Sequence, residues 1–222
     1  MAYKVVEKFV SINGEGPSSG KLAVFIRFAG CNLDCSYCDT RWANQEDADF
    51  QWMAAEEIYE YIHSTGIRYV TLTGGEPLQQ REVLTLLKIL SSDARLSVEI
   101  ETNGSVDLEP FCCIENNPPR FIMDYKLGSS GMEDRMQVKN FQYLTEKDTV
   151  KFVIGSLEDL GRTKEIIGRF DLSGRTKVYI SPVFGEINME EIVAFMKEHL
   201  MNDVTLQVQL HKIIWHPERR GI

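Results

Sequence analysis

Three cysteines lie within eight positions of one another, Cys31, Cys35 and Cys38, and follow the pattern C-x3-C-x2-C. A structural zinc site normally has four protein ligands, and a four-cysteine iron–sulfur site needs one more thiolate than these three. No fourth cysteine is near in sequence, and the closest histidine is His63. Three thiolates on a cubane leave one iron open to a substrate or cofactor. The spacing therefore favours a 4Fe-4S cluster with an open iron.

The other two cysteines, Cys112 and Cys113, are adjacent to each other and distant from the first three. The total of five is odd and the spacing is uneven, which argues against a disulfide framework. We expect Cys112 and Cys113 to be structural or incidental.

Two further candidates follow apolar, strand-like runs. Thr73-Gly74-Gly75-Glu76-Pro77 offers glycines that let a ligand approach the backbone, and a carboxylate that can accept from an ammonium group. Glu99 and Glu101 alternate along a strand and so share one face. If that face is a barrel interior, an unpaired carboxylate there is costly, and we favour Glu101 as a substrate contact and catalytic candidate.

The cysteine pattern after a strand resembles the signature of the radical S-adenosylmethionine (SAM) superfamily. The resemblance implies that SAM chelates the open iron, that an electron from the cluster cleaves it, and that the resulting 5′-deoxyadenosyl radical takes a hydrogen atom from the substrate. Iron–sulfur clusters and SAM are both carriers of radical chemistry. By position, the residues implied to contact SAM are Tyr37, Cys38, Asp39, Gly75, Glu76, Tyr125, Lys126, Leu127, Ser181, Pro182, Val183 and Phe184.

The N-terminal region indicates which family within this superfamily the chain resembles. The stretches 9–17 and 23–31, with Cys38-Asp39-Thr40 and Gln209-Leu210-His211-Lys212, are similar to the 7-carboxy-7-deazaguanine synthase family. This implies a carbon–nitrogen lyase of queuosine (7-deazapurine) biosynthesis, a tRNA modification pathway. Such an enzyme contracts the ring of 6-carboxy-5,6,7,8-tetrahydropterin with loss of ammonia and regenerates SAM.

The same resemblance implies roles for individual residues. Arg27 offers a bidentate fork to the substrate carboxylate, and Glu15 an acceptor for its guanidine-like edge. Thr40 matches the residue that supplies a hydroxyl ligand to Mg²⁺, an ion that prefers oxygen ligands. The implied substrate-binding set is Ile12, Asn13, Gly14, Glu15, Arg27, Thr73 and His211.

Two features depart from the family pattern. Many members have Gln where this chain has Asn13, so a contact through the Asn13 side chain is not assured. The tail 214–222 is longer than in members whose terminal carboxylate touches substrate, so that contact is not carried over to Ile222.

These residues must be positioned by alternating strands and helices, which predict an α/β fold with a mainly parallel sheet. A full eight-unit barrel needs more residues, and 105–120 and 127–148 contain no convincing helix. We therefore expect a single domain, 1–222, forming a partial, open β/α barrel of the radical SAM type with shortened crossovers. Strands are expected at 23–28, 69–73, 96–102, 121–125, 150–154, 177–181 and 204–210, and helices at 56–63, 84–90, 160–170 and 192–200.

The composition of the chain limits which partners and which location can be expected. The chain has 222 residues and a net charge of −9, which is poorly suited to direct nucleic-acid binding. No apolar run is long enough to span a membrane and no signal peptide is recognisable, so we expect a cytoplasmic protein. The expected partners are a small-molecule substrate, an electron donor such as flavodoxin or ferredoxin, and, by family resemblance, a second copy in a homodimer.

Two alternatives stay open. A glycyl-radical-enzyme activase also uses C-x3-C-x2-C but consumes SAM and binds a partner protein; Asn13-Gly14-Glu15-Gly16 and Arg27 argue against it. A non-catalytic zinc-binding module would hold one zinc and no iron.

Overall fold

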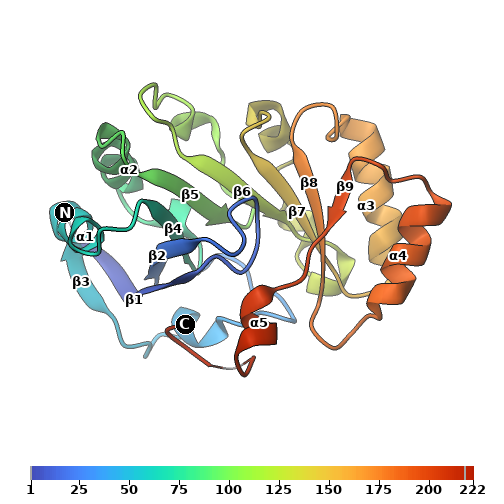
Figure 1. Cartoon of the computed structure of the whole chain (residues 1–222), viewed down its shortest axis with the longest axis horizontal. Coiled ribbons are helices and arrows are strands. Elements are labelled where there is room, and N and C mark those ends of the chain that lie inside the picture. The colour runs from blue at the N-terminus through green and yellow to red at the C-terminus, as the bar shows by residue number, and fades with distance from the viewer. Residues whose placement is uncertain (1, 218) are drawn as a thin grey trace.

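The computed structural model describes residues 2–217 and 219–222, and in them one nine-stranded sheet runs in the order β3-β1-β2-β4-β5-β6-β7-β8-β9 (Figure 1). From β2 to β9 each neighbouring pair is parallel, whereas β1 is antiparallel to both β2 and β3. The strands are β1 Ala2–Ile12, β2 Leu22–Phe28, β3 Gln51–Ala54, β4 Tyr69–Gly74, β5 Ser97–Thr102, β6 Arg120–Tyr125, β7 Thr149–Ile154, β8 Lys177–Pro182 and β9 Val204–Leu206.

Four helices cover the outer side of the sheet and a fifth lies below its opening (Figure 1). Their amphipathic faces explain their place: Ile58 and Ile62 of α1, four residues apart, are both fully buried. Ser156 and Asn188 cap α3 and α4 by accepting from backbone N–H groups of the first turn. The helices are α1 Ala55–Ser64, α2 Val83–Ser92, α3 Leu157–Phe170, α4 Met189–Glu198 and α5 Leu210–Ile214.

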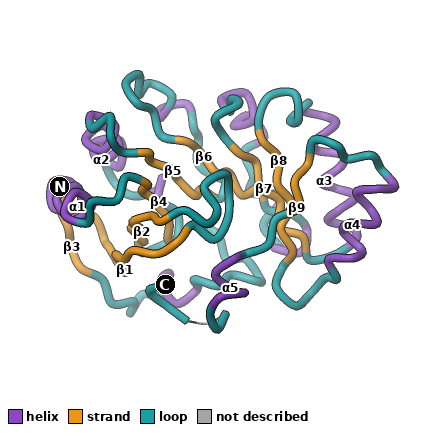
Figure 2. The backbone as a smooth tube through the Cα atoms, viewed as in Figure 1, coloured by secondary structure: helices purple, strands orange, loops and turns teal. Residues whose placement is uncertain are grey.

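The open barrel with shortened crossovers is confirmed. The sheet order begins at β3 and finishes at β9 without joining them. The connections after β5 and β6 hold short 3₁₀ turns in place of α-helices, and Figure 2 shows them mostly as loop. Because these loops follow the carboxyl ends of parallel strands, they reach the edge where ligands bind in such sheets.

Three local expectations were wrong or incomplete. The strand expected at 204–210 stops at Leu206, and Leu210–Ile214 forms the helix α5. Leu200 lies beyond α4 with a φ of 50° and is 75% exposed, so it is not part of that helix's buried stripe. The antiparallel strands β1 and β3 were not among the predicted elements, because their charged and exposed residues mask the alternation.

Strand alternation directs side chains either to the helices or to the barrel interior. On β2, Val24, Ile26 and Phe28 are fully buried, while Phe25 and Arg27 face a central cavity. Among the described residues no helix has the length and apolar character needed to cross a membrane.

Candidate active site

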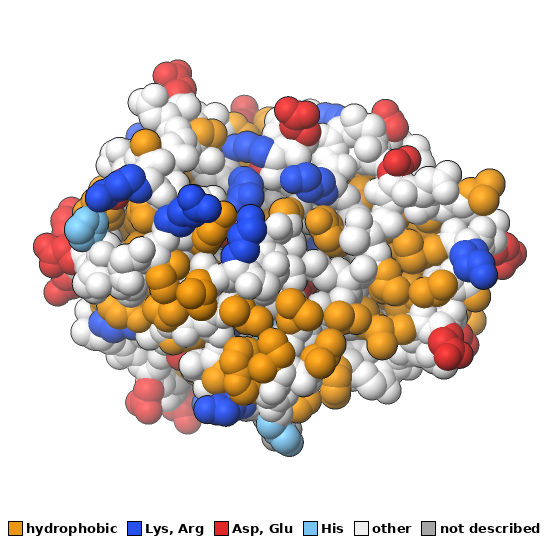
Figure 3. All heavy atoms as spheres, viewed as in Figure 1, with side chains coloured by type: hydrophobic (Ala, Val, Ile, Leu, Met, Phe, Trp, Pro, Cys, Tyr) orange, Lys and Arg blue, Asp and Glu red, His pale blue; other side chains and the backbone are white. Residues whose placement is uncertain are grey.

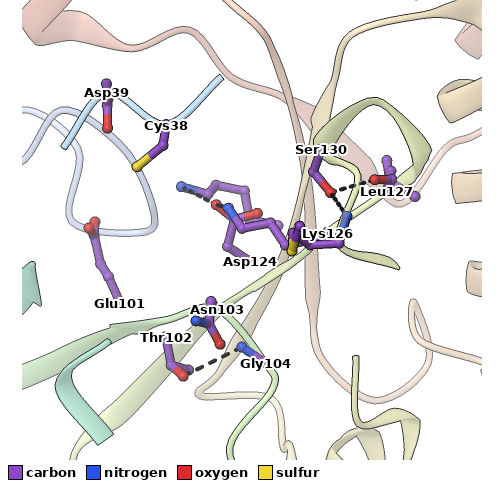
Figure 4. A network of polar contacts seen from close by, with 12 residues as sticks. Cys38, Asp39, Glu101, Thr102, Asn103, Gly104, Asp124, Lys126, Leu127 and Ser130 are labelled. Carbon is purple, nitrogen blue, oxygen red and sulfur yellow. Dashed lines mark hydrogen bonds and ion pairs between the residues drawn. The ribbon is translucent and has the colours of Figure 1, made fainter. Parts of the chain in front are cut away.

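The central cavity has a volume of about 870 Å³, a size suited to small-molecule ligands. Its walls come from the cysteine loop, the inward faces of the strands, α5 and the C-terminal residues. In Figure 4, Cys38, Glu101 and Lys126 approach the same open space from the cysteine loop, β5 and β6. Segments far apart in the sequence therefore meet around one chamber.

The three thiols of Cys31, Cys35 and Cys38 all line this cavity. Burial raises the pKa of the Cys31 thiol and raises that of Cys35 to about 11. The thiols of Cys31 and Cys35 are thus protonated when no metal is present, and metal binding to them must release protons. The remaining two cysteines, Cys112 and Cys113, are exposed and do not line the cavity.

The cysteine loop is held in place by Asn103 at the end of β5. Its Nδ2 donates to Asn32 Oδ1 at 3.0 Å and lies 3.5 Å from Cys31 Sγ. Below it, the buried Glu76 carboxylate accepts from the Asn103 N–H at 2.7 Å and from the Thr102 hydroxyl at 2.9 Å. Burial raises the pKa of Glu76 to about 7. Glu76 therefore fixes the loop that touches the cysteine wall.

The Gly-Gly turn brings β4 against the cysteine loop. A Cβ on Gly75 would lie 1.8 Å from the Gly30 carbonyl oxygen, and one on Gly74, whose φ is 131°, would lie 2.2 Å from the Phe28 carbonyl oxygen. Only glycine fits this approach. The backbone of Gly74 and Gly75 is thereby exposed on the cavity wall.

The residues present fit an open 4Fe-4S cluster with SAM beside it. The thiols of three cysteines line the cavity, and no other cysteine of the chain reaches it. The hydroxyl oxygen of Tyr37 is buried without a partner, as are Asn44 Oδ1 and Asp124 Oδ1. Unpaired polar atoms beside a cavity are what a polar ligand would satisfy.

A chain of charges crosses the cavity from Glu15 to Lys126, which lies near Cys35 and Tyr37. Lys151 Nζ lies 2.7 Å from Glu15 Oε2 and 3.5 Å from Asp124 Oδ2, and Asp124 in turn pairs with Lys126 at 2.9 Å. Burial alone would raise the pKa of Glu15, but Lys151 and the Gln209 amide outweigh it and hold that pKa below its usual value. Glu15 is therefore an ionised acceptor.

The two glutamates of β5 share a face, as predicted. Glu99 pairs with Arg120 at 3.4 Å, outside the cavity lining, whereas Glu101 lines the cavity and accepts from the Thr73 hydroxyl at 3.0 Å. Burial raises the pKa of both carboxyls. Of the two, Glu101 is the one that a ligand can reach.

Arg27 enters the cavity from β2 and forms an ion pair with Glu7 of β1, in which Arg27 Nε lies 3.0 Å from Glu7 Oε2. The bond uses the inner nitrogen of the guanidinium. Because Arg27 lines the cavity, its terminal nitrogens remain available for a carboxylate, which a guanidinium can bind with two parallel bonds.

The first loop and the last helix close the cavity together. The Leu210 N–H donates to the Gly14 carbonyl at 3.0 Å, and Gln209 Nε2 donates to Glu15 Oε1. Burial lowers the pKa of His211, which also lines the wall. Beyond α5, Arg220 stacks on Trp42 at 4.1 Å, and Ile222 reaches the wall.

Most of the predicted site residues lie on the cavity wall. Five do not: Asn13, Glu76, Tyr125, Leu127 and Ser181 are outside the lining, and their roles stay predictions. On β6 the reason is strand alternation, because Asp124 and Lys126 point inward while Tyr125 packs against Phe141 and Phe152. The predicted residues on the wall are Ile12, Gly14, Glu15, Arg27, Cys31, Cys35, Tyr37, Cys38, Asp39, Thr40, Thr73, Gly75, Glu101, Lys126, Pro182, Val183, Phe184 and His211.

Asn13 is placed away from the cavity by a different contact. Its Oδ1 accepts from the Thr71 hydroxyl at 2.8 Å, and its Nδ2 is buried without a partner. Ser181 is turned toward the chain after β9, where its hydroxyl donates to the Gln207 carbonyl.

The expected Mg²⁺ ligand Thr40 lies beside the cysteine wall, with Oγ1 3.8 Å from Cys38 Sγ. Within the described part of the chain, no three His, Cys, Asp or Glu side chains lie close enough together to share a single metal ion, which leaves the wider spacing of a four-iron cluster at the three cysteines untouched. A magnesium ion here would thus depend on the Thr40 hydroxyl, water and substrate oxygens.

Sequence reasoning missed several wall residues, above all Glu7, Lys151 and the tail residues Arg219 and Arg220. Lys151 carried a signal, since it is a charged residue inside an otherwise apolar run, 149–154. The others had no local pattern to mark them.

Comparison with known proteins agrees with this geometry. Residues 25–198 match the radical SAM superfamily. The 7-carboxy-7-deazaguanine synthase of Clostridium acetobutylicum is 59% identical over 222 residues, covering 100% of both chains. The chain belongs to the 7-carboxy-7-deazaguanine synthase family of radical SAM enzymes.

Other members of the family are more distant. Those of Leptospira interrogans and Methanospirillum hungatei are 34% and 36% identical, over 97% and 96% of this chain and 96% and 86% of their own. The crystal structure of QueE from Escherichia coli has a TM-score of 0.74 over 94% of each chain at 21% identity, a likeness of fold. Family membership implies the 4Fe-4S cluster and SAM.

Proposed function

We propose that this protein is a lyase that contracts the ring of 6-carboxy-5,6,7,8-tetrahydropterin to 7-carboxy-7-deazaguanine and releases ammonia. The observation that carries the proposal is one chamber with three thiols at one wall and the Arg27 fork and Glu15 carboxylate at another. A carboxylated pterin presents the complementary groups, one carboxylate and an edge of N–H donors. The full-length likeness to family members supports the same substrate.

When bound, the cluster and SAM supply the radical that takes a hydrogen atom from the substrate. The residues of the chain bind and orient the substrate and SAM. Arg27 binds the substrate carboxylate, and Glu15 accepts from the guanidine-like edge. Glu101, which burial makes a weaker acid, lies between them and faces the reacting ring. Gly75 and Lys126 lie on the SAM side.

Magnesium is the third cofactor that we propose, bound through Thr40. Its support is the place of Thr40 on the wall next to Cys38 and the exposed carboxylate of Asp39 nearby. A second oxygen-rich partner would come from the substrate, since Mg²⁺ keeps water and takes few protein ligands.

We also propose a cytoplasmic enzyme of one domain, 1–222, that acts as a homodimer and takes electrons from a flavodoxin- or ferredoxin-like donor. One continuous sheet and one core support the single domain. Large apolar side chains are exposed around α5 and α4, among them Phe184, Ile213 and Ile214, at 59%, 66% and 53%, and Figure 3 shows orange side chains gathered there. Such a surface suits a second copy.

The decisive experiment is anaerobic turnover. Protein reconstituted with iron and sulfide is mixed with 6-carboxytetrahydropterin, SAM, Mg²⁺ and a reductant, and the deazaguanine product and ammonia are measured. We expect product with no stoichiometric release of 5′-deoxyadenosine. Omission of Mg²⁺ should slow the reaction. Stoichiometric 5′-deoxyadenosine would instead point to a glycyl-radical-enzyme activase and contradict the proposal.

The metal content distinguishes the proposed iron–sulfur enzyme from a non-catalytic zinc-binding module. About four irons per chain and a broad visible absorbance support the cluster. One zinc and no colour would show a zinc-binding module in place of an enzyme.

A further inference from the structure

Lys151 is a charged residue in the middle of β7, a strand whose other residues are buried or apolar. Its side chain is about 10% exposed and lines the cavity. A lysine is rarely buried unless it is paired. Its partners come from two other elements, Glu15 from the β1–β2 loop and Asp124 from β6, at 2.7 and 3.5 Å.

The contact with Glu15 is the tighter of the two and joins residues 136 positions apart. The same carboxylate accepts from Gln209 through its other oxygen. Each carboxylate oxygen has two lone pairs, so both oxygens of Glu15 keep capacity for a further donor. Glu15 is 9% exposed and its remaining access is to the cavity.

We propose that Lys151 is a positioning residue for substrate, which holds the Glu15 carboxylate charged and fixed so that it can accept from the N–H edge of the pterin. The proposal rests on the proposed function for the identity of that ligand. The ion pair itself rests on the geometry alone.

The charges around the pair favour this role. Asp124 and Glu101 add negative charge near Glu15, Lys126 pairs with Asp124, and His211 and Arg27 lie farther along the wall. With Lys151 neutral, three carboxyls would share a buried chamber, and like charges in low dielectric take up protons. Lys151 is the cation that contacts two of them.

A role as an acid catalyst fits less well. Burial would lower the pKa of Lys151, but Glu15 and Asp124 outweigh it and raise that pKa well above its usual value. A group that holds its proton so strongly is a poor donor to departing ammonia. Lys151 therefore acts through Glu15.

The test compares Lys151→Met with Lys151→Arg in full-length, reconstituted protein. Lys177→Met is the matched control, because Lys177 is exposed on the neighbouring strand and its loss changes the net charge equally. The carboxyl carbon of Glu15 is followed by carbon-13 NMR and assigned by its absence in Glu15→Gln. We expect its titration to move to higher pH in Lys151→Met, to stay close to the wild type in Lys151→Arg, and not to change in the control.

Kinetics give a second measurement. In Lys151→Met the KM for 6-carboxytetrahydropterin should rise about ten- to hundredfold, the effect of losing a charged hydrogen bond, with a smaller change in kcat. That KM should rise further as the pH falls, because Glu15 becomes protonated, whereas the wild-type KM stays flat over the same range.

The outcomes are distinguishable. A folded Lys151→Met protein with an unmoved Glu15 titration overturns the inference. If Lys151→Met moves the Glu15 titration but the wild-type protein never turns over the carboxypterin, the result supports the ion pair and contradicts the proposed function. If Lys151→Met does not fold, Glu15→Gln/Lys151→Met should recover a cooperative unfolding transition, and failure to do so counts against the pair.

Discussion

Arg27 shows how one ion pair can prepare a ligand site. Glu7 accepts from Arg27 Nε on the neighbouring strand, and both side chains are more than four-fifths buried. The pair restrains a side chain that otherwise has many rotamers, and so lowers the entropy lost when the guanidinium binds a carboxylate. The orientation of Arg27 is therefore a property of two strands.

The first prediction tests this orientation. Glu7→Ala should raise the KM for the carboxypterin about tenfold with kcat nearly unchanged, because ground-state binding is lost and the reacting atoms are untouched. Steady-state kinetics measure it, with Glu60→Ala on the exposed side of α1 as the control. An unchanged KM would mean that Arg27 is ordered without Glu7.

At the residue scale, local spacing was sufficient for the cysteines and insufficient for Lys151. The pattern of Cys31, Cys35 and Cys38 is contained in eight positions, so it can be recognised without a fold. The meaning of Lys151 depends on Glu15, which lies 136 positions away in the chain. Its burial could be expected from the strand, but its partner could not.

Among the elements, α5 is the one that sequence patterns misjudged. Residues 204–210 alternate in a way typical of a strand, yet the ladder with β8 finishes at Leu206. The chain then turns because Gln207 and Gln209 are taken up by contacts to Gly16 and Glu15. Tertiary hydrogen bonds decided this element over local propensity.

The second prediction tests the docking of α5. An ideal Cβ on Gly14 would lie 2.1 Å from His211 Nδ1, so Gly14→Ala must displace the His211 ring, and with it α5 or the loop if the ring cannot turn away. Substrate binding should weaken at least about tenfold, since Glu15 and His211 move apart. Iron content should stay the same, because the cysteine wall is formed by other elements. Loss of the cluster in Gly14→Ala would show that the cysteine wall depends on the wall formed by α5 and the Gly14 loop, and would contradict the prediction.

The third prediction concerns α3, where Gly161 and Gly168 lie within a helix and a Cβ on either meets nothing within 4 Å. Gly168→Ala should increase the free energy of unfolding by about 0.5–1 kcal/mol, because alanine loses less backbone entropy in a helix. Denaturant unfolding measures it, with Gly161→Ala as a replicate. Turnover should not change, as α3 is on the outer side of the sheet. A destabilised variant would mean that the glycine serves a contact.

Predicted elements were most accurate where strands are buried on both faces. The predicted bounds of β4, β5, β6, β7 and β8 agree with the structure to within one or two residues, because rows of β-branched and aromatic residues mark fully buried strands. β1 carries Lys4, Glu7 and Lys8 among its apolar residues and was missed. β1 is next to the edge strand β3, and its partly exposed, charged positions weaken the signal toward this rim of the sheet.

For the whole molecule, the fourth prediction separates cysteines that bind the cluster from those that do not. Cys35→Ser should lose most of the bound iron and all turnover, whereas Cys112→Ser/Cys113→Ser should keep both. The exposed pair lies in the loop after β5 and does not line the cavity. Iron analysis and visible absorbance after reconstitution give the answer. Iron lost with the exposed pair would revise the ligand set.

The open barrel and its parallel order were foreseeable because chain length excludes a closed barrel and alternating elements favour parallel pairing. The part of the site that could not be foreseen is the lower wall, where Gly14, Glu15 and Gly16 meet Gln207, Gln209 and Leu210. Contacts this distant in sequence leave no local pattern.

That contact between segments 191 positions apart also sets the order in which the parts of the site are made on the ribosome. The cysteine loop, the Gly-Gly turn and Asn103 all lie between residues 30 and 103, so the parts of the cysteine wall are translated before Gln207 and Gln209. The partners of Gly14, Glu15 and Gly16 are translated later, at positions 207–210. The wall at Gly14, Glu15 and Gly16 therefore cannot be completed until positions 207–210 have been translated.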